Sequence, residues 1–153
     1  MYVNEKTSEV LNDLIRINND RIEGYNRAEK ECDDEDSDLQ SVFRQMSAES
    51  RSYVTDLSKY VTASGEQPTD DTTNSGKIYR VWMDVKATFT GKDRKAILAS
   101  CEFGEDAAQK AYDSALSSDA DFNTEIRQLI MDQKTSLKKS HDRIKSMRDR
   151  QPA

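Results

Sequence analysis

A short motif, a polar residue followed by a tyrosine and an alanine, occurs twice in this chain at the same spacing. The two copies are Asn18-x6-Tyr25-x2-Ala28 and Glu105-x6-Tyr112-x2-Ala115. In each copy the polar residue lies two helical turns before the tyrosine, on the apolar face of an expected helix. Inward carboxylates on facing helices of a bundle can bind buried metal ions. The amide in one copy therefore raises the question of whether such a site is complete.

A dimetal site in a four-helix bundle takes a carboxylate from each of two helices and a Glu-x-x-His pair from each of the other two. Two divalent cations in a low-dielectric core need several anionic oxygens to offset their charge and lost hydration. The corresponding positions in this sequence are Asn18, Glu105, Ser50 with Tyr53, and Gln133 with Ser136. Only Glu105 supplies a charge among them, so a working dimetal site is not expected.

The same residues predict a buried hydrogen-bond network instead. Buried polar groups without partners cost on the order of 1–3 kcal/mol each, so inward polar side chains should bond to one another. The predicted members of this polar core are Asn18, Ser50, Tyr53, Tyr25, Tyr112 and Gln133. With no cation beside it, Glu105 is expected to have a raised pKa. We then expect Glu105→Gln to leave stability at neutral pH nearly unchanged.

A reduced metal site is the alternative interpretation. Glu102 and Glu49 lie at the edges of two apolar stripes, and His141, the single histidine, lies on the last one. The candidate metal ligands are Glu105, Glu102, Glu49 and His141, with iron, manganese or zinc as the ion. Against this, edge carboxylates usually meet water or a lysine, and a histidine near a bundle end is typical of hydrogen-bonded packing. The main interpretation predicts no cofactor.

Four long helices, predicted from apolar residues spaced three and four apart, position these residues. The predicted ranges are 8–31, 37–64, 94–117 and 122–149, with a shorter helix over 77–90 that carries Trp82. Short turns make each pair of long helices an antiparallel hairpin, and nearly thirty residues separate the two hairpins. One long crossover is typical of ferritin-like bundles. We therefore predict an all-α, ferritin-like four-helix bundle, with 1–153 as a single domain.

Composition limits the partners that this chain is expected to have. The net charge is −6, which argues against a nucleic-acid-binding surface. No apolar run approaches the roughly 20 residues that cross a bilayer, and the polar first residues lack the apolar core of a signal peptide. The sequence thus predicts a cytoplasmic protein with neither a membrane nor a nucleic-acid partner. A homo-oligomer, with a dimer favoured, or a protein partner is expected.

Three common catalytic motifs are missing from the sequence, and no nucleophile and base can be paired in it. It has no Gly-x-Ser-x-Gly elbow, no phosphate-binding glycine loop and no His-Glu-x-x-His pair. The sequence therefore favours a protein that is not an enzyme.

A set of segments in fixed order carries a family resemblance. The segments are Leu11-Asn12-Asp13-Leu14-Ile15, Ile22-Glu23-Gly24-Tyr25, Gly76-Lys77-Ile78-Tyr79-Arg80-Val81-Trp82, Gly104-Glu105-Asp106 with Tyr112 and Ala115-Leu116, and Ser140-His141-Asp142-Arg143-Ile144. Together they resemble an uncharacterised bacterial family of ferritin-like four-helix-bundle proteins, classed as a domain of unknown function. The resemblance implies a ferritin-like fold and a cytoplasmic bacterial protein, and no established reaction.

A wider resemblance is to rubrerythrin-type proteins, in which a glutamate stands seven residues before an inward tyrosine. Glu105 and Tyr112 match that pattern, whereas Asn18 departs from it. The Glu-x-x-His positions depart as well. We therefore expect a non-catalytic ferritin-like bundle whose dimetal ligands are largely lost, with a stress-associated role as one hypothesis. The alternative is a metal-binding or redox protein with a reduced carboxylate site around Glu105.

Overall fold

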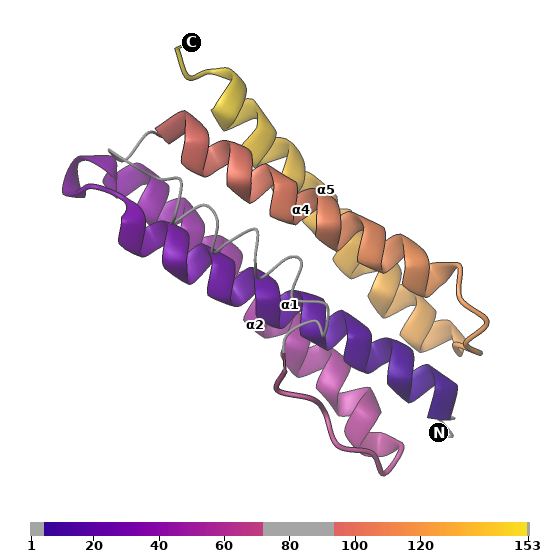
Figure 1. Ribbon diagram of the computed structural model, residues 1–153. Helices are drawn as coiled ribbons and strands as arrows, with labels where there is room; N and C mark the ends of the chain where they lie inside the picture. The colour runs from indigo at the N-terminus through magenta and orange to yellow at the C-terminus, as the bar shows by residue number, and fades with distance from the viewer. Residues whose placement is uncertain (1–4, 72–93, 153) are drawn as a thin grey trace.

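The computed structural model describes residues 5–71 and 94–152, and these residues form four long helices and no strand (Figure 1). The helices are α1 (Glu5–Glu31), α2 (Ser37–Ala63), α4 (Arg94–Leu116) and α5 (Thr124–Asp149), and a 3-10 turn, η1 (Asp34–Asp36), precedes α2. The all-α prediction is confirmed, and the predicted helix ends agree within three residues. The predicted helix over 77–90, with Trp82, lies outside the described residues.

Local interactions explain where two of these helices begin and end. The side chain of Asn123 accepts a hydrogen bond from the backbone N–H of Ile126 at 2.8 Å and so caps the start of α5. At the end of α2, Gly65 has a φ of +88°, the left-handed conformation that suits glycine after a helix.

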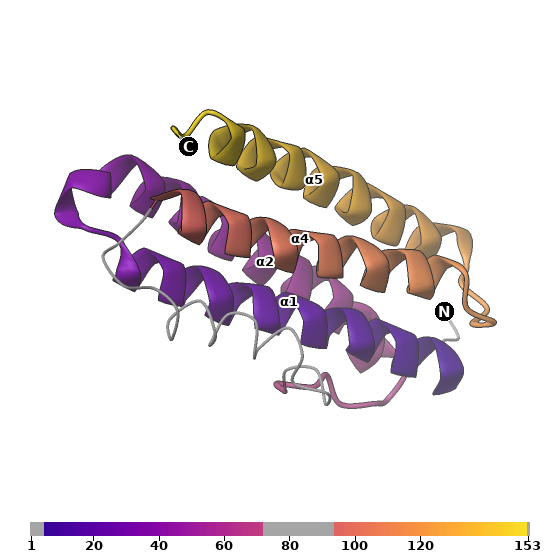
Figure 2. The same cartoon turned by 45° about the horizontal axis from the view of Figure 1, so that its top comes forward.

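The helices pack as two hairpins, with α1 along α2 and α4 along α5, and α1 also lies against α4 (Figures 1 and 2). At one end of the bundle, Ser8 near the start of α1 bonds to Ser64 after α2 at 2.8 Å. At the other end, Arg94 at the start of α4 pairs with Asp36 and Asp38 at 2.6 and 2.9 Å. Hence α2 and α4 run in the same direction, and α2 ends at the opposite end from where α4 begins.

Two groups of apolar side chains fill the interior, one toward each end of the bundle. The group near the start of α1 includes Leu11, Leu14, Ile15, Leu57, Ile126 and Ile130. The group near the start of α4 includes Leu39, Phe43, Ile97, Leu98 and Ile144. Buried polar residues come between the two groups along the helices. The fold therefore places a polar layer at mid-height of an otherwise apolar core.

The outer faces of the helices carry ion pairs within and between helices. Lys138 pairs with Asp142 on α5 at 2.7 Å, and Lys134 pairs with Asp113 across α5 and α4 at 2.6 Å. Across 5–71 and 94–152, none of the helices combines the length and the apolar content that a membrane span needs.

Candidate functional site

The six residues predicted to form a polar core lie together in the layer at mid-height. Five of them expose no more than 3% of their surface, and Tyr53 is half-buried. The five buried residues are Asn18, Tyr25, Ser50, Tyr112 and Gln133. The inward spacing of three and four along each helix accounts for this convergence.

A chain of hydrogen bonds crosses this layer from α2 through α1 and α4 to α5. Ser50 Oγ donates to Asn18 Oδ1 at 2.9 Å, and Asn18 Nδ2 donates to the Tyr112 hydroxyl at 2.9 Å. The Tyr112 hydroxyl donates to Gln133 Oε1 at 2.6 Å. Gln133 Nε2 then donates to the backbone oxygen of Tyr53 at 3.4 Å. Each link thus satisfies a polar group that burial would otherwise leave without a partner.

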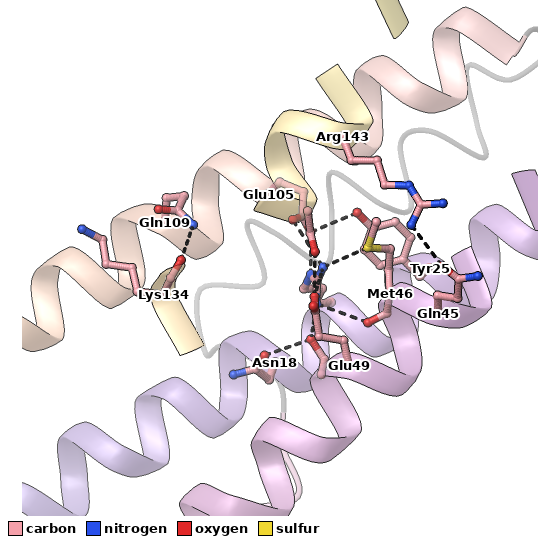
Figure 3. A network of polar contacts seen from close by, with 12 residues as sticks. Asn18, Tyr25, Gln45, Met46, Glu49, Glu105, Gln109, Lys134 and Arg143 are labelled. Atoms are coloured by element: carbon pink, nitrogen blue, oxygen red, sulfur yellow. Dashed lines mark hydrogen bonds and ion pairs between the residues drawn. The ribbon is translucent and has the colours of Figure 1, made fainter. Parts of the chain in front are cut away.

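An arginine that the sequence pattern did not single out lies at the centre of the layer. The Arg21 side chain is only 2% exposed. Its Nε donates to Glu105 Oε1 at 2.5 Å, and its Nη2 donates to Glu105 Oε2 at 3.3 Å and lies 2.9 Å from Glu49 Oε1. Figure 3 labels these two glutamates, which approach the polar layer from α4 and α2. Nη1 donates to Ser50 Oγ at 2.8 Å and to the Met46 oxygen at 3.2 Å. All three guanidinium nitrogens therefore have acceptors.

Glu105 has a second donor besides the guanidinium. The Tyr25 hydroxyl donates to Glu105 Oε1 at 2.9 Å, and the guanidinium carbon of Arg21 lies 5.2 Å from the centre of the Tyr25 ring. Paired and hydrogen-bonded in this way, the buried carboxyl has the partners that an ionised group requires. Glu105 therefore has a cationic partner, Arg21, and the condition under which the sequence predicted a raised pKa is not met.

The electrostatics of the layer keep the arginine charged and the tyrosine neutral. Burial acts to lower the pKa of Arg21, but the charge and hydrogen bond of Glu105, together with contributions from Tyr25 and Glu49, outweigh it and the pKa is raised. Burial and the charge of Glu105 raise the pKa of Tyr25 well above its usual value, so its hydroxyl stays a donor. Glu49, 26% exposed, lines an open groove between α2 and α5 and forms the solvent-facing side of the layer.

The sequence did carry a signal for Arg21. It follows Asn18 by three residues and precedes Tyr25 by four, so it belongs to the same helical face. Arginine is mostly found at the protein surface, so the residue type alone favoured an exposed position for Arg21. The carboxylates of Glu105 and Glu49, which lie on two other helices, offset the desolvation cost of burying this charge.

The four predicted metal ligands divide between two places. Glu105 and Glu49 both contact Arg21. Glu102 and His141 instead lie between α4 and α5 with Asp106, which was not predicted, and one ligand atom of each of these three residues falls within 4.8 Å of the others. Among residues 5–71 and 94–152, the two pairs do not come together into the single site around Glu105 that the sequence suggested.

The thiols offer little nucleophilic chemistry. Cys32 and Cys101 are both buried and free. Burial raises the pKa of Cys32 to about 11, and burial followed by the charge of Glu105 raises that of Cys101 well above its usual value. Because the thiolate is the reactive form, neither cysteine is activated for catalysis.

The helices and the polar layer place this chain among the all-α helical-bundle proteins. Residues 6–118 match the family described as a domain of unknown function (DUF2383), and the chain belongs to that family. The match includes Arg21, Glu49 and Glu105, so the central ion pair lies within the family's domain. No curated protein matches the chain.

Proposed function

We propose that this chain is a ferritin-like bundle in which an arginine takes the place of the metal ions, and that it acts through its surface and not as a catalyst. Two observations support the ferritin-like assignment. Helices α2 and α4 run in the same direction, as a single long crossover requires. The inward polar residues also lie at one level of the four helices, where such bundles bind metal.

The position of the Arg21 guanidinium carries the proposal. It lies between Glu105 on α4 and Glu49 on α2, which were the two predicted metal ligands nearest the bundle centre. Its fixed fork of donors supplies the positive charge that these carboxylates need. A divalent ion bound to Glu105 would be placed next to this buried cation, where the low dielectric makes repulsion strong.

The surface is then the place where function resides. We propose a homo-oligomer, with a dimer favoured, or a protein partner in the cytoplasm, and the stress-associated role stays a prediction. Phe103 on α4 supports an interface because 57% of this large apolar side chain is exposed. Light scattering after size exclusion should give a dimer mass that falls to the monomer mass in Phe103→Ser. A monomer at all concentrations would contradict the oligomer.

Metal loading of the untagged chain tests the central proposal. We expect the rate of Fe(II) oxidation by oxygen to equal that of protein-free buffer. We also expect bound iron, manganese or zinc, measured by elemental analysis, to be the same in the wild type and in Glu105→Gln. The opposite result is a stoichiometric metal that disappears in Glu105→Gln and persists in His141→Gln, because it would place the ion at Glu105.

A further inference from the structure

A second group of charged side chains lies between α4 and α5 on the flank of the bundle and shares no residue with the Arg21 layer. Glu102 and Asp106 are four residues apart on α4 and therefore share one helical face. His141 reaches them from the neighbouring α5, and its Nε2 lies 2.6 Å from Asp106 Oδ1. One ligand atom from each of the three residues lies within 4.8 Å of the others. One imidazole and two carboxylates thus converge between two helices.

The imidazole ring is oriented from outside this group. His141 Nδ1 lies 3.1 Å from Asp142 Oδ1, and Lys138 donates to the same oxygen at 2.7 Å. With Nδ1–H bonded to a carboxylate, Nε2 is the nitrogen that can bind a metal ion, which then replaces the proton between Nε2 and Asp106; this is the usual support of a ligating histidine. Nε2 is the atom that faces Asp106.

The Glu102 carboxylate is supported in a similar way. Arg148 donates to Glu102 Oε2, which leaves the second carboxylate oxygen for another contact. The side chains of Glu102 and His141 are each 12% exposed, whereas that of Asp106 is 53% exposed. Two ligands are therefore held within the α4–α5 seam, and the third is open to solvent, which gives an ion a way in and room for a bound water.

We propose that Glu102, Asp106 and His141 bind one divalent transition-metal ion of the zinc type on the α4–α5 flank. A mixed set of imidazole nitrogen and carboxylate oxygen suits zinc and its neighbours better than magnesium or calcium, which prefer oxygen alone. Three protein ligands with a water in the fourth position is a common zinc arrangement. The ion would replace the direct contact between His141 and Asp106 and link the two helices.

This proposal is independent of the one for the bundle centre. The Arg21 layer excludes an ion at Glu105, while the flank group neither contains Arg21 nor shares a ligand with that layer. Glu105→Gln should therefore leave zinc affinity on the flank unchanged. The two proposals can fail separately in the same set of variants.

Calorimetric titration of the untagged full chain with ZnCl2 tests the flank site. We expect one zinc per chain in the wild type and at least about tenfold weaker binding in His141→Gln and in Asp106→Asn. Asp113→Asn is the matched control, since Asp113 lies on α4 and pairs with Lys134, outside the group. Equal affinity in the wild type and His141→Gln, or an equal loss in Asp113→Asn, would overturn the proposal.

A spectroscopic measurement on the wild type tests the same site without relying on variants that could fail to fold. The chain has one histidine, so its imidazole NMR signals report on His141 alone. Saturating zinc should shift the Nε2 resonance more than the Nδ1 resonance. Imidazole signals that do not respond to zinc would show that any bound ion is elsewhere and would overturn the assignment.

Discussion

The Arg21 guanidinium donates to both oxygens of the Glu105 carboxylate, from Nε at 2.5 Å and from Nη2 at 3.3 Å. The two side chains come from α1 and α4 and are almost wholly buried. A two-point contact of this kind fixes the relative position of the helices as well as neutralising the charges. It links the first hairpin to the second at the level where an inward carboxylate alone suggested a metal site.

Glu105→Gln should destabilise the protein, contrary to the expectation from sequence. The substitution leaves the buried guanidinium with only the partly exposed Glu49 as a charged partner. Removing one member of a buried ion pair typically costs about 3–5 kcal/mol. Urea unfolding at pH 7, followed by circular dichroism, measures this loss. Glu9→Gln, on the exposed face of α1, is the control and should change stability by less than about 0.5 kcal/mol.

Tyr112→Phe should cost about 1–3 kcal/mol, since it leaves Gln133 Oε1 without its donor in a buried layer. Asn18 loses an acceptor but keeps its bond to the Leu14 oxygen at 2.8 Å. Tyr60→Phe is the control because Tyr60 donates to Glu125 in an exposed contact. The same unfolding experiment applies to both variants. If both variants lost the same free energy of unfolding, the buried hydrogen bonds would contribute no more to stability than an exposed one, contrary to this prediction.

Gly65→Ala should destabilise α2 by about 1–2 kcal/mol because alanine is strained at a φ of +88°. A Cβ at this position would meet no atom within 4 Å, so the loss would come from the backbone alone. Gly65→Asn should recover part of it, since asparagine tolerates the left-handed conformation. Thermal unfolding of the three proteins gives the comparison, and an asparagine variant less stable than the alanine variant would argue against this cause.

Stability should fall as the pH rises from 10 to 12, in part through Tyr53. Burial raises its pKa from 10.0 to about 12. In this window the unfolded tyrosine has lost its proton while the folded one keeps it, so the unfolded state binds fewer protons and ΔG of unfolding decreases. Below pH 10 the contribution is fully present. Tyr53→Phe should show a shallower decline in urea titrations over this range, and a decline as steep as the wild type would contradict the assignment.

The regular parts of the fold were predictable because they depend on local patterns. Apolar residues spaced three and four apart predicted all four described helices. The stripes also identified Asn18, Ser50 and Glu105 as inward-facing. Each of these features depends on which face of one helix is apolar, so the sequence of that helix alone is enough to predict it.

The partners of the charged residues were not predictable in the same way. Whether Arg21 is buried depends on Glu105 and Glu49, which lie 84 and 28 residues further along the chain. Asp106 joined Glu102 and His141 only through the pairing of α4 with α5. An arginine or aspartate placed on a helix flank has no preferred partner until the helices are aligned side by side, so the sequence pattern alone left these contacts open.

A double-mutant cycle between Arg21 and Glu105 tests most directly whether an ion pair holds the bundle centre. The variants are Arg21→Met, Glu105→Leu and the two combined, and the measurement is the free energy of unfolding in urea at pH 7. Each single variant should lose about 3–5 kcal/mol, whereas the double variant should lose much less than the sum, because apolar side chains can replace a buried pair. Strictly additive losses would contradict the ion pair.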